Sequence, residues 1–317
     1  MENYYNISWL EQDKLHQTSI LKRLFYFFSR PLLSTYASQF LSPQTLKILQ
    51  PSLVLPGRGM PLETRRFWGS VLCKIREATI LVQGTGTGWD VISWARLKPK
   101  KIIATDLFEF KDSWTEIIHY CKEKLNVEIE FYQSPLEDHS FLEDESIDFC
   151  ASDAVFEHCQ DLKSVLKESF RVLKPGGSLY AGYGPLWFSA GGDHFSGGGG
   201  LQNVFNHLLL DSEQYMKYFL SLLQTNEDFQ SGGCYVELDL FSRLSTQEYC
   251  NLFQKVGFKI KDLILQLDPK SLAFKTKFPE NFQQLCNKYT NKHEDDFLIS
   301  SNLVRLVKPF SNYQKLH

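Results

Sequence analysis

The chain lacks several features that would place it in a specialised class of protein. Its seven cysteines are scattered from Cys73 to Cys286 and form no CxxC pair. This odd, scattered set predicts reduced thiols rather than a disulfide framework. The N-terminus shows no signal-peptide pattern, so we expect a cytoplasmic protein. The apolar cluster at 24–28 is too short to span a bilayer, and no stable membrane insertion is expected.

Strong charge and metal-ligand patterns are missing as well. The net charge is −3 and no basic block stands out, so no nucleic-acid partner is expected. No tight spacing of metal ligands appears, and we predict no metal site. The 43% hydrophobic and 22% charged fractions are those of an ordinary soluble protein. A chain of 317 residues is long for a minimal α/β domain, which favours one domain with insertions.

One stretch, residues 79–106, organises the rest of the chain. Apolar and β-branched residues at 79–83 and 101–105 predict two buried strands, and residues 89–95 carry apolar side chains at helical spacing. Between the first strand and the helix lies a loop with glycine at every second position, 84, 86 and 88. Glycines let a ligand approach the backbone, and the following helix offers unpaired N–H groups. Asp106, at the tip of the second strand, can accept hydrogen bonds from both hydroxyls of a ribose.

The spacing of the glycines distinguishes between two kinds of nucleotide ligand. A dinucleotide fingerprint, GxGxxG, requires its last glycine where this chain has Trp89. A nicotinamide-dependent oxidoreductase is therefore disfavoured, although it stays an alternative. The remaining GxGxG pattern, with an acid 18 residues after Gly88, resembles the cofactor loop of class I S-adenosylmethionine-dependent methyltransferases.

Two later segments resemble the small-molecule, methyltransferase-11-like branch of the same family. They are Phe156-Glu157-His158 and Arg171-Val172-Leu173-Lys174-Pro175-Gly176-Gly177. The resemblance is strong over about residues 75–185, and it implies an α/β fold with a doubly wound, Rossmann-like sheet of seven strands, of which strand 7 is antiparallel. We expect these strands at 79–83, 101–105, 127–132, 146–152, 178–183, 258–265 and 302–307.

Two regions fall outside the family plan. Residues 1–74 are expected to form an N-terminal helical lid or extension, and 75–317 the methyltransferase domain with an insertion at about 184–245. The first region contains an amphipathic helix at 8–28 that Pro31 ends or kinks, a second helical stretch at 34–50 in which Pro43 follows a Ser42 cap, and a loop at 51–61. A lid, an oligomer contact and a peripheral membrane patch stay open for these helices, as does the oligomeric state, a homodimer included.

The resemblance implies S-adenosyl-L-methionine as cofactor and S-adenosyl-L-homocysteine as product. The implied cofactor-binding residues are Gln83, Gly84, Thr85, Gly86, Gly88, Asp106, Leu107, Ser134, Leu136 and Asp153. Gln83 and Ser134 stand where family members often have an acid. Asp153 can compensate for Gln83 by contacting the α-amino group. Arg65 or Arg66 can reach the methionyl carboxylate, although charges on a solvated surface are the preferred interpretation.

The glycine-rich insertion is expected to hold the methyl acceptor. His194, with Asp193 beside it, is the predicted general base, because histidine titrates near neutral pH. Predicted acceptor contacts are Tyr183, Trp187, Phe188 and His207. Glu157 and His158 follow a strand end, where the family implies a bracing role.

The predicted function is methyl transfer from S-adenosyl-L-methionine to an oxygen or nitrogen of a small-molecule acceptor. A non-catalytic binding or scaffold protein with the same fold is the main alternative, since Gln83 and Ser134 depart from the family pattern.

Overall fold

A central eight-stranded sheet is the framework of the molecule. The computed structural model describes residues 18–225 and 239–310. The strand order is β1-β7-β8-β6-β5-β2-β3-β4, and β8 runs antiparallel to both β6 and β7 while the other neighbours are parallel. The strands are β1 (Leu53–Pro56), β2 (Thr79–Gln83), β3 (Lys101–Asp106), β4 (Glu128–Gln133), β5 (Ile147–Asp153), β6 (Leu173–Tyr183), β7 (Lys259–Leu267) and β8 (Ile299–Val307). The predicted doubly wound sheet with an antiparallel last strand is confirmed.

The sheet has one more strand than the sequence predicted. Residues 51–61 were expected to form a loop, but β1 lies within them and pairs in parallel with β7. Val54 and Leu55 are 2% exposed, so this short strand buries its apolar side chains against neighbours more than two hundred residues away in sequence. Such a partner leaves no local signal, and the prolines and glycines around β1 favoured a loop.

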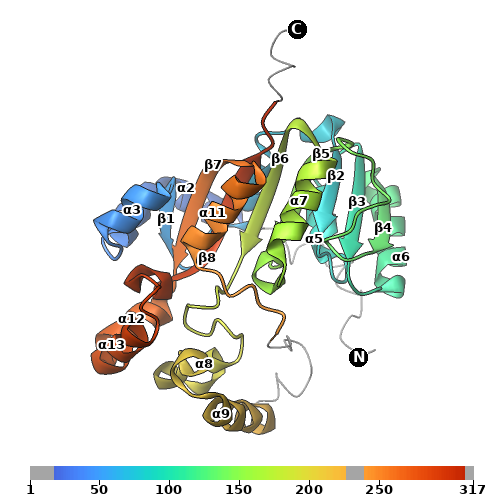
Figure 1. Cartoon of the computed structure of the whole chain (residues 1–317). Coiled ribbons are helices and arrows are strands. Elements are labelled where there is room, and N and C mark those ends of the chain that lie inside the picture. Colours follow the sequence, from blue (N-terminus) through green and yellow to red (C-terminus); the bar gives the residue numbers. More distant parts are fainter. Residues whose placement is uncertain (1–17, 226–238, 311–317) are drawn as a thin grey trace.

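Helices cover both faces of the sheet. They are α2 (Ile20–Ser38), α3 (Pro43–Leu49), α4 (Leu62–Ser70), α5 (Trp89–Ala95), α6 (Lys111–Tyr120), α7 (Leu162–Val172), α8 (Asn206–Leu209), α9 (Ser212–Thr225), α11 (Thr246–Val256), α12 (Pro269–Lys277) and α13 (Pro279–Lys288). Figure 1 shows α7 and α11 in front of the sheet and α5 behind it. The front core contains Val165 and Phe253, and the rear core contains Trp94 and Ile117. Both faces are therefore buried, as an α/β sheet with parallel strands requires.

Several helix ends follow local signals in the sequence. The Ser42 side chain accepts a hydrogen bond from the Thr45 N–H at the start of α3, where Pro43 is the first residue. Ser245 and Glu248 form a capping box at the start of α11, and Gly257 ends that helix in the left-handed conformation. Pro31 is different: α2 continues through it to Ser38, so the proline does not end the helix, which was one of the two outcomes expected. The part of the predicted first helix before residue 18 lies outside the described residues.

The insertion and the C-terminal helices lie beyond the carboxyl ends of the parallel strands. Figure 1 shows α8 and α9 below the sheet, with α12 and α13 beside them. This region contains the two helices α8 and α9, with a break at Leu210 and Asp211. Helix α12 was not predicted. These elements place the 184–205 loop at the edge of the sheet where doubly wound folds bind their ligands.

Candidate active site

The glycine loop between β2 and α5 has the geometry that its sequence predicted. The Gly84 and Thr85 N–H groups donate to the Thr105 carbonyl at 2.8 and 3.1 Å, which ties the loop to β3. Gly84 has φ +68°, and a Cβ there would lie 2.3 Å from Val155 Cγ2. Gly86 has φ +51°, but nothing lies within 4 Å of the place its Cβ would take. The loop thus presents bare backbone to an open space at Gly86.

Asp106 lies at the end of β3 and contacts this loop directly. Its Oδ2 accepts a hydrogen bond from the Gly86 N–H at 2.6 Å, and its Oδ1 accepts one from the Phe108 N–H at 3.0 Å. Burial raises the pKa of Asp106, and these backbone donors partly offset that rise. A carboxylate offers about four acceptor positions, and these backbone donors do not use all of them. Asp106 can therefore fix the loop and accept hydrogen bonds from a ribose at the same time.

The residues after β3 and β4 form the neighbouring wall. Leu107 follows Asp106 and is 51% exposed, which leaves its side chain free to cover a planar ring. The Ser134 N–H donates to the Asp106 carbonyl at 2.8 Å, whereas the Ser134 hydroxyl donates to the Asp138 carbonyl within its own turn. Leu136 is 8% exposed and packs in the front core. Ser134 therefore borders Asp106, and Leu136 supports the turn from beneath.

Gln83 points away from the open side of the loop. Its side chain is 1% exposed, and its Nε2 donates to Ser169 Oγ on α7 at 3.0 Å. The amide thus joins β2 to α7 in the core.

Asp153, at the end of β5, belongs to a buried ion network. It pairs with Arg66 of α4, which also pairs with Asp90 of α5. The Tyr180 hydroxyl donates to Asp153 Oδ1 at 2.7 Å. The Arg66 guanidinium lies over the ring of Trp94, 4.6 Å from its centroid. Arg66 is 2% exposed, so it is not a charge on a solvated surface. Two carboxylates and an aromatic face take the place of water around its guanidinium.

Arg65 is placed differently from its neighbour. Its side chain is 29% exposed, and its Nη2 lies 3.6 Å from Asp153 Oδ1. Its Nε is buried and has no hydrogen-bond partner within the described residues. A guanidinium with an unused donor at the carboxyl ends of β2 and β5 can bind a ligand carboxylate.

The segment after β5 connects the glycine loop to the insertion. Val155 packs against Gly84, and two residues later the Glu157 Oε1 accepts a hydrogen bond from the Gly184 N–H at 2.8 Å. Burial raises the pKa of Glu157 to about 8, although Arg58 nearby opposes the rise. Its Oε2 is buried and has no hydrogen-bond partner within residues 18–225 and 239–310. Glu157 is thus a carboxylic acid at neutral pH, with one oxygen free to meet a ligand.

His158, the residue after this acid, packs its ring against that of His194. The rings of His158 and His194 are 4.9 Å apart between centroids, and both contact Phe241, at 5.0 and 5.4 Å. Burial and the nearby His158 lower the pKa of His194 to about 4. The His194 Nε2 is buried and has no hydrogen-bond partner in the part of the chain that is described. His194 is consequently a neutral imidazole with a nitrogen available to a ligand.

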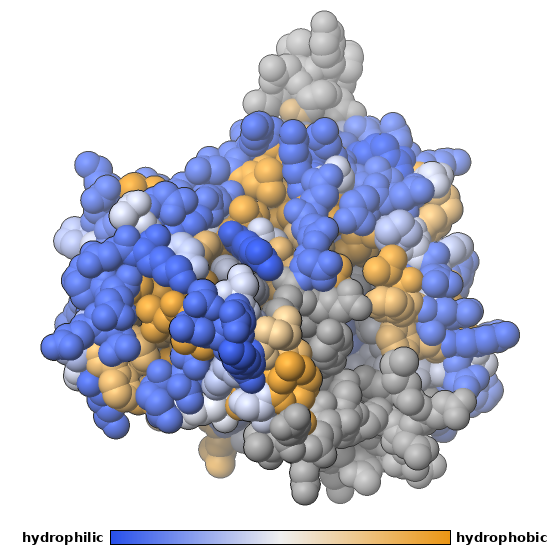
Figure 2. Space-filling view, turned by 60° about the horizontal axis from the view of Figure 1, so that its bottom comes forward, coloured by the Kyte–Doolittle hydropathy of each residue, from blue (hydrophilic) through white to orange (hydrophobic). Residues whose placement is uncertain are grey.

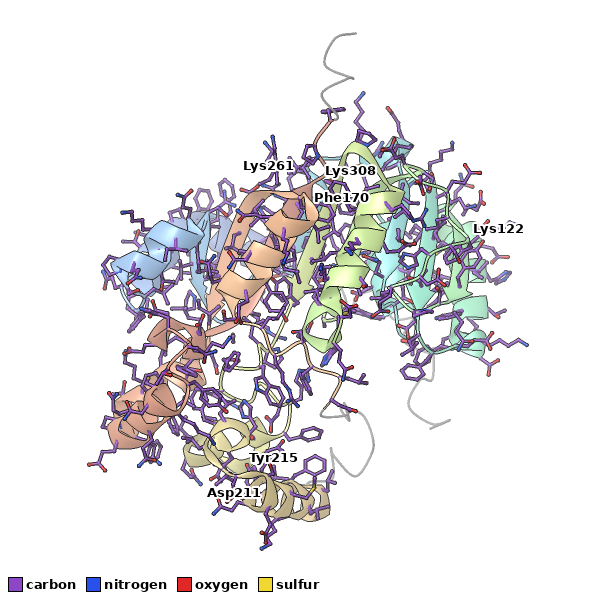
Figure 3. The ribbon with its side chains drawn as sticks, in the orientation of Figure 1. Lys122, Phe170, Asp211, Tyr215, Lys261 and Lys308 are labelled. Atoms are coloured by element: carbon purple, nitrogen blue, oxygen red, sulfur yellow. The ribbon has the colours of Figure 1, made fainter. Side chains whose placement is uncertain are left out.

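Asp193 is used by groups other than His194. Its carboxylate accepts hydrogen bonds from the Ser196 N–H and hydroxyl and from the Tyr215 hydroxyl, at 2.9, 2.7 and 2.6 Å. Its Oδ1 also lies 3.7 Å from His207 Nδ1. Figure 3 marks Tyr215 at the lower end of the molecule, on α9. Asp193 therefore ties the loop to α8 and α9, and His207, not His194, is the histidine with which it pairs.

The predicted acceptor residues divide into two groups. Trp187 contacts Phe241 at 5.1 Å and His207 at 5.3 Å between ring centroids, so it lies near the histidine pair. The His207 Nε2 is 2.8 Å from the Trp187 carbonyl oxygen, which makes His207 a brace for that residue. Tyr183 packs in the front core, 4.6 Å from the Tyr249 ring. Phe188 packs in a separate core with Phe297.

Sequence reasoning missed several members of this arrangement. Phe241 lies in a stretch for which no structure was predicted, and Arg58 lies in the expected loop at 51–61. Burial lowers the pKa of Arg58, while Glu157 and Asp268 nearby oppose the fall, so Arg58 lies among these acids. No local pattern marks either residue, since the rings around Phe241 are 47 to 83 residues away in sequence and the acids around Arg58 are 99 and 210 residues away. Figure 2 brings forward the bottom of the view in Figure 1, where the carboxyl ends of the parallel strands lie. It shows hydrophobic side chains in small patches among hydrophilic ones.

Comparison with known proteins identifies the domain that carries this geometry. Residues 81–181 match the family model described as a methyltransferase domain. A malonyl-[acyl-carrier protein] O-methyltransferase of Yersinia pestis is 34% identical over 100 residues, which are 32% of this chain and 34% of that protein. The chain thus matches about a third of the length of this curated relative.

Solved structures to which the chain is similar include two bacterial proteins. One is a Listeria monocytogenes protein placed among the S-adenosylmethionine-dependent methyltransferases, with 18% identity, coverage of 78% of this chain and 99% of that one, and a TM-score of 0.47. Another is an S-adenosylmethionine-dependent methyltransferase of Mesorhizobium loti, with 15% identity, coverage of 78% and 99%, and a TM-score of 0.44.

Residues 81–181 are a class I S-adenosylmethionine-dependent methyltransferase domain. They belong to the methyltransferase-11 branch, and the cofactor of this domain is S-adenosyl-L-methionine. The described residues fit that molecule: Gly86 borders open space, Asp106 has unused acceptor positions, and the Thr85 hydroxyl is buried without a partner. In residues 18–225 and 239–310, no group of three or more metal-ligating side chains comes together, and no helix is both long and apolar enough to cross a membrane.

Proposed function

We propose that the whole chain is a methyltransferase that acts on an oxygen or a nitrogen of a small molecule. The observation that carries this proposal is the short segment after β5. Val155 packs on the glycine loop of the cofactor site, while Glu157 bonds Gly184 and His158 lies beside His194. A donor on one side of this segment and an acceptor on the other would lie close to each other, which is the main requirement of methyl transfer.

The proposed cofactor contacts follow from the geometry of the strand ends. Asp106 accepts hydrogen bonds from the ribose hydroxyls, Leu107 covers the adenine, and Arg65 binds the methionyl carboxylate. Bound S-adenosyl-L-methionine supplies an electrophilic methyl group. The remaining contacts predicted from the sequence, from Gln83 and Asp153, are indirect in this proposal, because those side chains hold α7 and α4 in place.

His194 is the proposed general base. Its pKa is lowered to about 4, so the imidazole is neutral throughout the physiological range and its free nitrogen can accept a proton from a hydroxyl or an amine. The same shift makes it a weaker base than the near-neutral histidine that was expected from the sequence. Glu157, which is protonated at neutral pH, donates a hydrogen bond to the acceptor through its free oxygen. The name of the Yersinia pestis relative specifies methylation of oxygen, which supports an oxygen acceptor. Trp187 and Phe241 enclose the acceptor with aromatic surface.

The first experiment is calorimetric titration of the protein with S-adenosylhomocysteine and, in parallel, with NADH. Binding of S-adenosylhomocysteine alone supports the proposal and justifies a screen of acceptors with methyl-labelled cofactor. In that screen, His194→Ala should abolish transfer of the label and leave S-adenosylhomocysteine affinity within about twofold, since the ring lies on the acceptor side. Ser146→Ala, at a half-buried position just before β5 and thus at the opposite end of the strand from the site, is the control. Unchanged turnover in His194→Ala contradicts its role as the base.

A non-catalytic binding protein is the second candidate. The observation that favours it is Gln83, which stands where an acid is frequent in the family and which turns its amide toward Ser169. Tight binding of S-adenosylhomocysteine without methyl transfer to any acceptor in the screen would favour this candidate. The cytoplasmic location, the homodimer and the lid role of residues 1–74 stay predictions.

A further inference from the structure

Helix α2 carries an unusually apolar outer surface. Of its described side chains only Tyr26 and Ala37 are buried. Leu21, Phe25 and Phe28, spaced by three or four residues, lie along one side of the helix and are 79%, 72% and 71% exposed. The exposed apolar side chains of α2 are Ile20, Leu21, Leu24, Phe25, Phe27, Phe28, Leu32 and Tyr36. We refer to these eight side chains as the α2 outer face.

Helix α4 lies next to α2 and exposes a large apolar side chain of its own. Trp68 of α4 packs in the same small core as Tyr26 of α2, so the two helices cover the same region of the sheet. The Thr18 N–H, just before α2, donates to Glu63 of α4 at 2.5 Å. Phe67 of α4 is 67% exposed. Large apolar side chains on two adjacent helices exceed the scattered exposure that is normal for a protein surface.

The charges of α2 all have one sign. Residues 20–38 include Lys22, Arg23 and Arg30 and contain no aspartate or glutamate. At helical spacing these basic residues fall at the two sides of the outer face, between it and the buried side at Tyr26. Arg23 lies close enough to Glu63 to lower the pKa of that carboxyl, so one acid of α4 faces this end of the helix. An exposed apolar face with basic flanks is typical of helices that lie in the surface of an anionic membrane.

We propose that the α2 outer face binds peripherally to an anionic lipid surface, with α2 lying in the plane of the interface. Phe25, Phe28 and Leu21 enter the acyl boundary, and Lys22 and Arg30 contact lipid phosphates. A second copy of the chain fits less well, because two α2 helices packed face to face would bring basic flanks together with no acid on either helix to pair with them. This binding is independent of methyl transfer.

The test is co-sedimentation of the full chain with vesicles of phosphatidylcholine, alone or mixed with phosphatidylglycerol. We expect binding to the mixed vesicles that weakens as salt is added. The triple variant Leu21→Ser, Phe25→Ser, Phe28→Ser should bind at least about tenfold more weakly, because three apolar side chains no longer leave water. The variant Lys22→Gln, Arg30→Gln should lose the preference for phosphatidylglycerol.

Met216→Ser with Leu220→Ser is the matched control. These two side chains of α9 are 45% and 49% exposed and lie outside the α2 outer face, so the control should bind vesicles like the original protein. The proposal is overturned if the original protein binds neither kind of vesicle or if the triple variant binds as well as it does. It is also overturned if light scattering shows a dimer that only the triple variant dissociates, because the face is then a contact between copies.

Discussion

At the scale of single residues, Asp106 combines two tasks. It holds the Gly86 N–H and, in our proposal, the ribose of the cofactor. Asp106→Ala should weaken S-adenosylhomocysteine binding about 10- to 100-fold, because it removes charge-assisted hydrogen bonds. Calorimetry measures this change. Asp112→Ala, at an exposed position on α6, is the control and should bind normally. Equal affinity in the two variants would place the ribose elsewhere.

Glu157 gives a residue-scale prediction about pH and stability. Its pKa is raised from 4.5 to about 8 in the folded chain, so the native state holds a proton that the unfolded chain releases over that interval. This protonation contributes to the free energy of unfolding. The contribution is fully present below pH 4.5, and roughly 1 to 3 kcal/mol is lost as pH rises through about 8. Glu157→Gln cannot titrate and should lose less stability over this interval. Urea unfolding curves at several pH values measure the difference, and parallel curves for both proteins would refute the prediction.

At the scale of elements, Arg66 joins α4 to α5 and β5 through Asp90 and Asp153. Arg66→Met should lower the free energy of unfolding by about 3 to 5 kcal/mol, since it leaves two acids without their partner in a dry site. Arg65→Met is the comparison and should lose clearly less, because Arg65 is partly exposed. Denaturant titration measures both. Similar losses in the two variants would mean that the network acts as a surface ion pair.

The glycine loop offers a matched pair of substitutions. Gly84→Ala should destabilise the fold by about 2 kcal/mol or more, because a positive φ coincides with a Cβ placed 2.3 Å from Val155. Gly86→Ala should destabilise it by only about 1 kcal/mol, since space is free there, but should weaken S-adenosylhomocysteine binding. Thermal unfolding and calorimetry separate the two effects. Normal binding by a folded Gly86→Ala protein would move the ligand away from this backbone.

The local part of this architecture follows from the sequence, whereas its long-range part does not. The glycine loop and the Ser42 cap depend on residues a few positions apart, and both were predicted. The position of β1 depends on β7, and the burial of Arg66 depends on Asp153, 87 residues away. Asp193 was assigned to its neighbour His194. Its carboxylate instead accepts hydrogen bonds from Ser196, three residues later in the loop, and from Tyr215 on α9. A contact between side chains that are far apart in the chain produces no local period or spacing in the sequence, so it could not be predicted.

At the scale of the whole molecule, ligand binding should increase the free energy of unfolding. A ligand that binds only the folded chain adds about 2.7 kcal/mol at a hundred times its dissociation constant. S-adenosylhomocysteine should therefore raise Tm by several degrees, and NADH should leave Tm unchanged. Differential scanning calorimetry tests this, with Asp106→Ala as a control that should show a smaller rise. A rise with NADH alone would instead support the oxidoreductase alternative.

The added strand β1 also bears on how the molecule avoids aggregation. It ends at Pro56 after only four residues, and the outward N–H of Val54 donates to Ser34 Oγ at 3.0 Å. The opposite edge, β4, carries Glu128 and Glu130, which pair with Lys101 at 3.3 and 2.6 Å. Neither edge is a long, uncharged row of free backbone groups on which a neighbouring chain could add a strand. The molecule is thereby protected against edge-to-edge growth into fibres.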